Sequence, residues 1–479
     1  MALPANKTKI VCTIGPACSS PEVMQQMMRA GMNVARLNFS HGDFAGHQEV
    51  IGNLRSAASA AGRRLAIMAD LPGPKMRIGQ LAREPVELRA GDLFTLTTED
   101  VVGDAGRVSV TFPRLPQAVK PGDILFLNDG NIQLEVDRVE AADVCCRVVV
   151  GGELRSRKGL NLPGIALGIS AFTERDRECL AFAKEQGIDA VSQSFVESGA
   201  DVEAVRTAAA SLGYQPFVIA KIERSSARDN LEGILRAADG IMIARGDLGV
   251  EIPIEMIALA QKYLVRLANL AGKPVITATQ MLESMTTNRR PTRAEATDVA
   301  NAILDGTDCV MLSGESAMGQ YPVEAVAMLA KIAATIEPMR PALRVRDLLR
   351  VSHQEGEISL PDLIARSVDN ALERIAPALV IVPTHSGYSA RRLARLRPEV
   401  WIAAVSSQES TCQQLQFSYG VHPVHEPEHP NDWNAYARRL LGALGVEGRL
   451  VVLTEGPSAE RPDANSRMEI LDLGRTEAR

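Results

Sequence analysis

The chain has 479 residues, of which 46% are hydrophobic and 23% charged, as in a soluble globular protein of two or three domains. Its formal net charge of −6 argues against nonspecific nucleic-acid binding, which needs a basic surface. The seven scattered cysteines form no C-x-x-C pair, and no signal peptide or membrane-spanning apolar run is apparent. We therefore expect a cytoplasmic protein with reduced thiols that binds neither nucleic acid nor membrane.

The first 70 residues alternate apolar runs with helical segments. One helix is expected to be capped near Ser19 or Ser20, with Pro21 in its first turn, and another is expected over 50–60. From 71 to 168 the pattern changes to short alternating segments with turn residues, which predicts an inserted all-β domain. The three strands expected before this insertion are 9–15, 32–39 and 65–70.

Strand and helix alternation resumes after the insertion. A capping box, Thr292 with Glu295, predicts the start of one of the helices. Together with the first three strands, the five new ones make eight, and the two barrel segments approach the ~250 residues typical of a (β/α)₈ TIM barrel. The alternative is an open doubly wound sheet, but no G-x-G-x-x-G follows any strand, and polar residues end nearly every strand. The five further strands are 190–195, 217–223, 241–247, 274–280 and 309–315.

The remaining residues predict a third domain. A proline-rich, charged linker over 337–357 precedes a second α/β unit, with a helix at 363–375, a strand at 378–383 and a basic helix at 390–397. Two further strands are expected at 400–405 and 449–453. We thus expect a first barrel segment (1–70), a β lid domain (71–168), a second barrel segment (169–343) and a C-terminal α/β domain (344–479).

Two apolar runs end in charged residues that suit catalysis. One ends in Lys221 and Glu223, and the other ends in Arg245-Gly-Asp247. If these strands are neighbours in a parallel sheet, Lys221, Glu223 and Asp247 meet at one edge. Two carboxylates suit a hard cation such as Mg²⁺, and a lysine suits an anionic substrate or a developing oxyanion. A surface ion-pair cluster is the alternative.

A second candidate site lies in the turn that opens the basic helix. Hydroxyl groups and a glycine at a helix N-terminus suit an anion, although ordinary helix capping would use the same residues. The candidate residues are Thr384, Ser386, Gly387 and Ser389.

The barrel segments resemble pyruvate kinase. The resemblance implies a barrel, a lid inserted after the third strand, a C-terminal regulatory domain and a homotetramer. It also implies conversion of phosphoenolpyruvate and ADP into pyruvate and ATP, the final step of glycolysis, with Mg²⁺ that Mn²⁺ can replace. The segments that carry the resemblance are 8–16, 31–42, 158–164, 241–253, 273–285, 290–295 and 298–316.

The same resemblance implies roles for individual residues. Glu223 and Asp247 would hold Mg²⁺, Lys221 would neutralise the transferring phosphoryl group and the enolate, and Arg36 would contact the phosphate. Backbone N–H groups at Gly246 and Asp247 suit the pyruvate carboxylate. Thr279 would lie near the carbon that is protonated, in a relay with Ser313 and Glu315. The expected nucleotide contacts are Asn38, His41, Arg77 and Lys158, with Asp129 closing over the metal from the lid.

One departure from the family concerns K⁺. Members that need K⁺ carry a threonine and a glutamate where this chain has Leu71 and Lys75. Our hypothesis is that Lys75 supplies the positive charge that K⁺ supplies elsewhere, so that K⁺ is not required. A residual cation pocket formed by Asn38, Ser40 and Asp70 is the alternative.

A second departure concerns regulation. The turn at 384–389 resembles the family's effector phosphate loop, but 454–463 lacks the tryptophan–arginine–proline–glycine loop of members activated by fructose-1,6-bisphosphate. Because Glu455 or Glu460 would repel a second phosphate, we expect a monophosphorylated activator, such as a sugar monophosphate or AMP.

Two other functions of the protein stay open. One is an Mg²⁺-dependent lyase or aldolase acting on a pyruvate enolate, which would not depend on ADP. The other is a non-catalytic sensor that binds phosphoenolpyruvate without turnover.

Overall fold

The computed structural model describes residues 2–165, 167–339, 359–457 and 465–474. Eight parallel strands close into a barrel in the order β1-β16-β15-β14-β13-β12-β3-β2, which confirms the predicted barrel and rules out the open sheet. Each strand overlaps its predicted segment; β3 ends one residue later and β14 begins one residue earlier than predicted, and most strands are shorter than predicted. Their bounds are β1 Lys9–Thr13, β2 Met32–Asn38, β3 Ala66–Leu71, β12 Ala190–Gln193, β13 Phe217–Ile222, β14 Gly240–Ala244, β15 Val275–Ala278 and β16 Cys309–Leu312.

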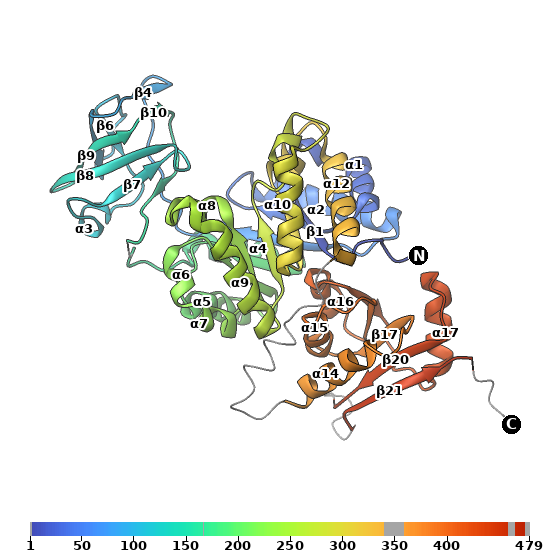
Figure 1. Cartoon of the computed structure of the whole chain (residues 1–479). Coiled ribbons are helices and arrows are strands. Elements are labelled where there is room, and N and C mark those ends of the chain that lie inside the picture. The colour runs from blue at the N-terminus through green and yellow to red at the C-terminus, as the bar shows by residue number, and fades with distance from the viewer. Residues whose placement is uncertain (1, 166, 340–358, 458–464, 475–479) are drawn as a thin grey trace.

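Helices surround this barrel (Figure 1). Every residue of β1, β3, β12, β14, β15 and β16 is buried, which explains why their sequences are mainly apolar. The helices are α1 Pro21–Ala30, α2 Phe44–Ala61, α4 Glu174–Glu185, α5 Gly199–Ser211, α6 Ser225–Asp229, α7 Leu231–Ala237, α8 Arg245–Glu251, α9 Ile257–Ala271, α10 Arg293–Asp305, α11 Gly314–Ala317 and α12 Pro322–Ile336.

Helix caps follow the sequence signals. Ser20 accepts a hydrogen bond from Val23 N at the start of α1, and Thr292 forms a capping box with Glu295 at the start of α10, both as predicted. Helix α2 begins earlier than the predicted residue 50, because Asp43 caps it. In the described residues no helix is long and apolar enough to cross a membrane.

The lid is inserted between β3 and β12 and stands apart from the barrel (Figure 1). A six-stranded sheet in the order β11-β7-β8-β9-β5-β6 and a two-stranded β10-β4 ribbon enclose a separate hydrophobic core. The elements are β4 Val86–Leu88, β5 Leu93–Thr97, β6 Arg107–Ser109, α3 Leu115–Ala118, β7 Ile124–Leu127, β8 Ile132–Glu140, β9 Asp143–Val150, β10 Gly152–Leu154 and β11 Leu160–Asn161.

The C-terminal domain is a five-stranded sheet in the order β19-β18-β17-β20-β21, parallel except for β21. Strands β19 and β21 were not predicted, because β19 carries two histidines and a proline and half of β21 is exposed. Most of the predicted linker, 340–357, lies outside the described residues. The elements are α14 Leu360–Leu372, β17 Leu379–Pro383, α15 Tyr388–Ala394, β18 Ile402–Ser406, α16 Glu409–Gln414, β19 Val421–His425, α17 Trp433–Leu444, β20 Leu450–Glu455 and β21 Arg467–Asp472.

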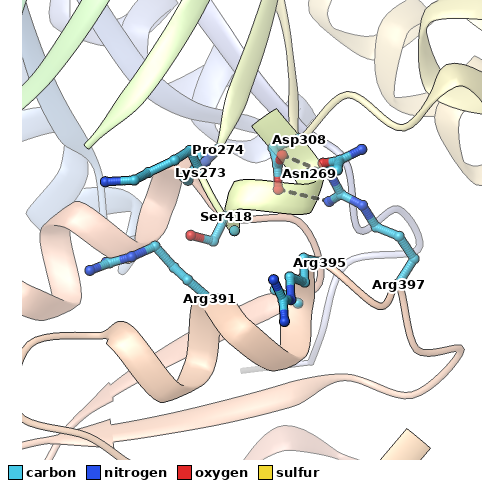
Figure 2. A pocket seen from close by; sticks show the side chains of 10 residues that line it. Asn269, Lys273, Pro274, Asp308, Arg391, Arg395, Arg397 and Ser418 are labelled. Carbon is cyan, nitrogen blue, oxygen red and sulfur yellow. Dashed lines mark hydrogen bonds and ion pairs between the residues drawn. The ribbon is translucent and has the colours of Figure 1, made fainter. Parts of the chain in front are cut away.

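Polar contacts join this domain to the base of the barrel, where the strands begin (Figure 2). Arg397 Nη1 and Nη2 donate to the two oxygens of Asp308 at 2.7 and 2.8 Å. Phe417 stacks on Phe217, the first residue of β13, with ring centroids 5.3 Å apart. The C-terminal domain therefore covers the base of the barrel, and the carboxyl ends of the strands face the opposite way.

Candidate active site

The carboxyl ends of β12, β13 and β3 bring a lysine and three acceptors together. Strands β13 and β14 are neighbours, as the sequence hypothesis required. Lys221 Nζ donates to Ser194 Oγ at 2.7 Å and lies 3.1 Å from Glu223 Oε2 and 3.6 Å from Asp70 Oδ1. Ser194 in turn donates to Leu71 O at 2.7 Å, so its oxygen lone pairs are directed at the ammonium group. Lys221 is therefore held in one position.

Asp70 also holds Arg36. Arg36 Nε donates to Asp70 Oδ2 at 2.9 Å, Nη2 donates to the same oxygen, and Nη1 donates to Thr13 Oγ1 at 2.8 Å. Ser192 Oγ donates to Asp70 Oδ1 at 2.8 Å. Burial alone would raise the pKa of Asp70, but Lys221 and Arg36 outweigh burial and lower it. Both oxygens of this expected K⁺ ligand thus already have cationic partners.

The charges at this edge influence one another strongly. Burial would lower the pKa of Lys221, but Asp70, Glu223 and Asp247 raise it, so the side chain remains an ammonium ion. Burial and the neighbouring Asp247 raise the pKa of Glu223 despite the opposing effect of Lys221. A divalent cation between Glu223 and Asp247 would relieve this repulsion.

The donor set fits Mg²⁺. Glu223 Oε1 accepts a hydrogen bond from Phe195 N at 2.6 Å, which orients the carboxylate, while Asp247 at the start of α8 is exposed. Within the described ranges no cluster of three or more histidine, cysteine or acidic side chains could enclose a metal. Two hard oxygen ligands leave the remaining positions to water and substrate, which is how Mg²⁺ is usually bound.

Strained backbone marks the same end of the barrel. Thr279 and Gln280 have φ of 75° and 54°, and Phe195 has φ of 59°. Such conformations persist only where the surroundings enforce them, and they cluster at functional sites. Arg245 Nη2 donates to Thr279 O at 2.7 Å. A Cβ atom on Gly246 would lie 2.9 Å from Thr279 Cγ2, so this close approach requires glycine.

Glu315 is fully buried and connects two loops. Its Oε2 accepts a hydrogen bond from Ser313 N at 2.7 Å, and its Oε1 accepts one from Leu282 N at 2.9 Å. Ser313 and Glu315, which were predicted as a proton relay, therefore lie together after β16 and join the loop that follows β15.

The predicted nucleotide contacts lie on the barrel rim and the lid hinge. Asn38 pairs in register with Asp70, and its Oδ1 accepts a hydrogen bond from Ser40 N at 3.1 Å. His41 is exposed, and partial burial together with the charges of Lys75, Arg77 and Arg36 lowers its pKa.

The two predicted lid cations lie on facing segments. Arg77 forms an isolated bridge with Gly159, and Ile78 N donates to Lys158 O at 2.9 Å. Asp129, with φ of 56°, lies in the turn after β7, beside Gly130. A Cβ atom on Gly130 would lie 3.2 Å from a methyl group of Val250 in α8. This lid turn therefore approaches the helix that begins at Arg245.

Lys75 is exposed. Its side chain has no hydrogen bond or ion pair among the described residues, including Asn38, Ser40 and Asp70. The hypothesis that Lys75 replaces K⁺ therefore stays a prediction.

Several site residues were not assigned a role by sequence reasoning. Ser194 lies near the end of the predicted strand 190–195 but was given no role, and Thr13 and Ser192 carried no distinguishing signal. Arg224 was missed altogether: its Nη1 donates to Glu251 Oε1 at 2.7 Å, and its Nη2 donates to Ile165 O at 2.7 Å. Because Ile165 belongs to the return segment of the lid, this buried pair fixes the lid's attachment to the barrel.

The predicted effector turn forms a compact loop before α15. Thr384 Oγ1 accepts a hydrogen bond from Gly387 N at 3.0 Å, Ser386 O accepts one from Arg391 Nη2 at 2.8 Å, and Ser386 and Ser389 are exposed. Gly387 has φ of 77°, a left-handed backbone conformation that glycine adopts without a steric penalty.

The nearby acidic residues have a different environment from the one expected. Glu455, at the end of β20, pairs with Arg467 at 2.6 Å and with His429 at 2.9 Å, so a cation offsets its charge. Glu460 lies outside the described residues. Repulsion of a second phosphate by Glu455 is therefore weaker than the sequence suggested.

Taken together, Arg36 and Lys221 beside two carboxylates at the carboxyl ends of a (β/α)₈ barrel define a barrel enzyme for an anionic substrate. Residues 5–326 match the family model described as pyruvate kinase, barrel domain, and residues 362–471 match pyruvate kinase, alpha/beta domain. The chain belongs to the pyruvate kinase family, whose members are phosphotransferases.

Individual relatives agree with the family models. The pyruvate kinase of Thermococcus litoralis is 48% identical over 476 residues, which cover 99% of this chain and 100% of that one. The pyruvate kinase of Geobacillus stearothermophilus is 44% identical, covering 97% of this chain and 80% of the relative. The crystal structure of a pyruvate kinase from Cryptosporidium parvum superposes with a TM-score of 0.90 at 35% identity, covering 98% of this chain and 96% of that one.

Proposed function

We propose that this chain transfers the phosphoryl group of phosphoenolpyruvate to ADP, giving pyruvate and ATP, with Mg²⁺ held by Glu223 and Asp247. The observation that carries the proposal is the position of Lys221, whose largely buried ammonium group lies between Asp70, Ser194 and Glu223. Phosphoryl transfer asks a protein mainly for positioning and for neutralisation of charge, and this arrangement provides both.

The substrate phosphate lies against Arg36 and Lys221 in this proposal. Asp70 fixes both cations, so neither must reorganise as the phosphoryl group leaves. Mg²⁺, when bound, withdraws charge from the phosphoryl and carboxylate oxygens. The substrate carboxylate accepts hydrogen bonds from the backbone at Gly246 and Asp247, and Lys221 then offsets the charge of the enolate.

Protonation of the enolate takes place on the side of Thr279. The strained backbone of Thr279 and its contact with Gly246 support this assignment. Ser313 and Glu315 connect the neighbouring loops and complete the relay.

The nucleotide phosphates occupy the opening between the barrel rim and the lid. His41 and Asn38 approach them from the rim, and Arg77 and Lys158 approach them from the lid. Closure brings Asp129 toward the metal and excludes water, which prevents hydrolysis of the phosphoryl group. The position of Gly130, where an added Cβ atom would lie 3.2 Å from Val250, supports this direction of closure.

We further propose that the enzyme does not require K⁺, because Lys75 supplies a positive charge beside the barrel rim, where it already affects His41. A monophosphorylated activator, such as a sugar monophosphate or AMP, binds the loop formed by Thr384, Ser386, Gly387 and Ser389. The remaining family properties that we propose are a homotetramer, a cytoplasmic location and a role in the last step of glycolysis.

A coupled assay tests the reaction. Pyruvate release is measured from phosphoenolpyruvate, ADP and Mg²⁺ in K⁺-free buffer, and again after K⁺ is added. We expect Lys221→Met to lower kcat at least about 10²-fold, as loss of a group that stabilises an oxyanion does. Lys262→Met, on the exposed face of α9, is the matched control. Turnover without ADP would indicate a lyase, and saturable binding of phosphoenolpyruvate without turnover would indicate a sensor.

A further inference from the structure

A cavity of about 400 Å³ lies between the base of the barrel and the C-terminal domain. Its walls come from α2, the start of β3, the segment before β12, and α16 of the C-terminal domain. This volume is within the range of small-molecule sites. A second cavity at the domain boundary (Figure 2) measures about 10 Å³ and has room for about one water molecule.

Three arginines line the larger cavity, and two of them have unused donors. Arg64 forms an ion pair with Glu409 that joins the barrel to α16. Arg55 uses Nη2 for the carbonyl groups of Gln186 and Gly187, and its Nε and Nη1 have no hydrogen bond in the stretches of chain that the structure describes. Arg63 is half-buried, and its guanidinium has no hydrogen bond or ion pair to any described residue. Two guanidinium groups with unused planar donors suit a phosphate group.

Two unused acceptors line the same cavity. Asp189 Oδ2 accepts a hydrogen bond from Ile67 N at 2.8 Å, while its Oδ1 accepts none among the described residues. Gln413 Oε1 is buried without a hydrogen-bond partner among the described residues, whereas Asp189 is half-buried. Buried acceptors are normally satisfied, so Gln413 Oε1, with Asp189 Oδ1 beside the same cavity, suits a ligand with hydroxyl donors. None of the described residues that line the cavity is aromatic, so they offer a nucleobase no stacking surface.

We propose that this cavity binds a sugar phosphate, with the phosphate on Arg55 and Arg63 and the sugar hydroxyls on Asp189 and Gln413. The site uses none of the residues of the 384–389 loop, and its occupancy does not depend on the proposed reaction. Its position links the two domains, because a ligand there touches α16 together with the bases of β3 and β12.

The position also connects the cavity with the active site. Ile67 lies in β3, which carries Asp70 at its other end, and Asp189 directly precedes β12, which carries Ser192. Both Asp70 and Ser192 belong to the network that holds Lys221 and Arg36. Ligand binding at the base of the barrel therefore stabilises β3 and β12, the two strands whose residues position the catalytic cations.

Calorimetric titration of the full-length protein with glucose 6-phosphate, in the absence of substrates, tests the proposal. We expect Arg63→Gln and Arg55→Gln each to weaken binding at this site at least about tenfold, whereas Ser386→Ala combined with Ser389→Ala leaves it unchanged. Arg83→Gln, on the lid surface, is the matched control. Glucose and inorganic phosphate should bind at least about tenfold more weakly than the sugar phosphate, and AMP should bind more weakly as well.

Several outcomes would overturn the proposal. These are no binding to the wild-type protein, unchanged binding to both arginine variants, loss of all binding in the serine variant, or tighter binding of AMP. Retained turnover of phosphoenolpyruvate by the arginine variants shows that they are folded. Because binding is measured directly, an inactive enzyme that still binds glucose 6-phosphate would reject the proposed reaction and leave this site intact.

Discussion

Asp70→Asn removes the negative charge that holds both catalytic cations while preserving the size of the side chain. Asp70 is almost fully buried, with Lys221 Nζ at 3.6 Å from Oδ1 and Arg36 Nε at 2.9 Å from Oδ2. Removing one member of a buried ion pair leaves uncompensated charge and costs about 3–5 kcal/mol. Coulomb's law at an effective dielectric constant of about 20 puts the lysine pair alone at about 4–5 kcal/mol, in the same range.

The effects of this substitution on stability and on catalysis can be measured separately. For a barrel of this size the loss corresponds to a decrease of at least about 6 °C in the midpoint of thermal unfolding, compared at one scan rate. Lys221 keeps its charge at neutral pH, since Glu223 and Asp247 also raise its pKa. The expected kinetic effect is therefore a misplaced Arg36, seen as a KM for phosphoenolpyruvate raised about tenfold or more, together with a lower kcat.

The sign of the pH dependence of stability follows from the pKa of Asp70. The folded state lowers the pKa of Asp70, so the stability from this carboxylate is present above its unfolded pKa and is lost as pH falls through the folded value. The wild-type advantage over Asp70→Asn should therefore shrink in acid. Asp137→Asn, on the exposed part of β8, is the control. An unfolding midpoint and a KM within error of the wild-type values would refute the reasoning.

Three other substitutions test separate regions of the molecule. Lys75→Glu should lower activity in K⁺-free buffer about tenfold or more and make it recover with added KCl; full activity without K⁺ would reject the role of Lys75. Arg224→Met leaves the buried carboxylate of Glu251 without a cation, so the midpoint of thermal unfolding should decrease. Adding Glu251→Leu should restore part of this loss. A single variant with the wild-type midpoint would contradict this. Burial raises the pKa of Asp189 to about 6, so its contribution to stability should decline as pH rises from about 4 to 6, and Asp189→Asn should abolish that component of the pH profile in urea unfolding.

Much of the barrel could be predicted because its strands are buried on both sides. Strands such as β14 and β16 have only buried residues, so their sequences are continuous apolar runs that end where polar residues begin. In the C-terminal domain only one residue of β21 is buried, and its side chains do not indicate a strand. Its pairing with β20 comes from backbone hydrogen bonds, which any sequence can make.

For a similar reason, the sequence predicted some residues of the candidate site and missed others. Lys221, Glu223 and Asp247 follow apolar strands directly, so their convergence follows from the parallel order of the sheet. Arg224 and Glu251 form a buried ion pair, but the other partners of Arg224 include the carbonyl groups of Leu162 and Ile165, some 60 residues away in the chain. No local pattern encodes such a contact.

The amino-acid sequence by itself determined the alternation of strands and helices, the inserted β domain and the charged residues at strand ends, because hydrophobic periodicity and helix caps act over a few residues. Only the tertiary structure decided how the charges are paired. It placed Asp70 between Arg36 and Lys221, offset Glu455 with Arg467, and left Arg63 without a partner among the described residues, beside a cavity. Electrostatic interactions depend on distance and burial in three dimensions, and neither can be read from positions along the chain.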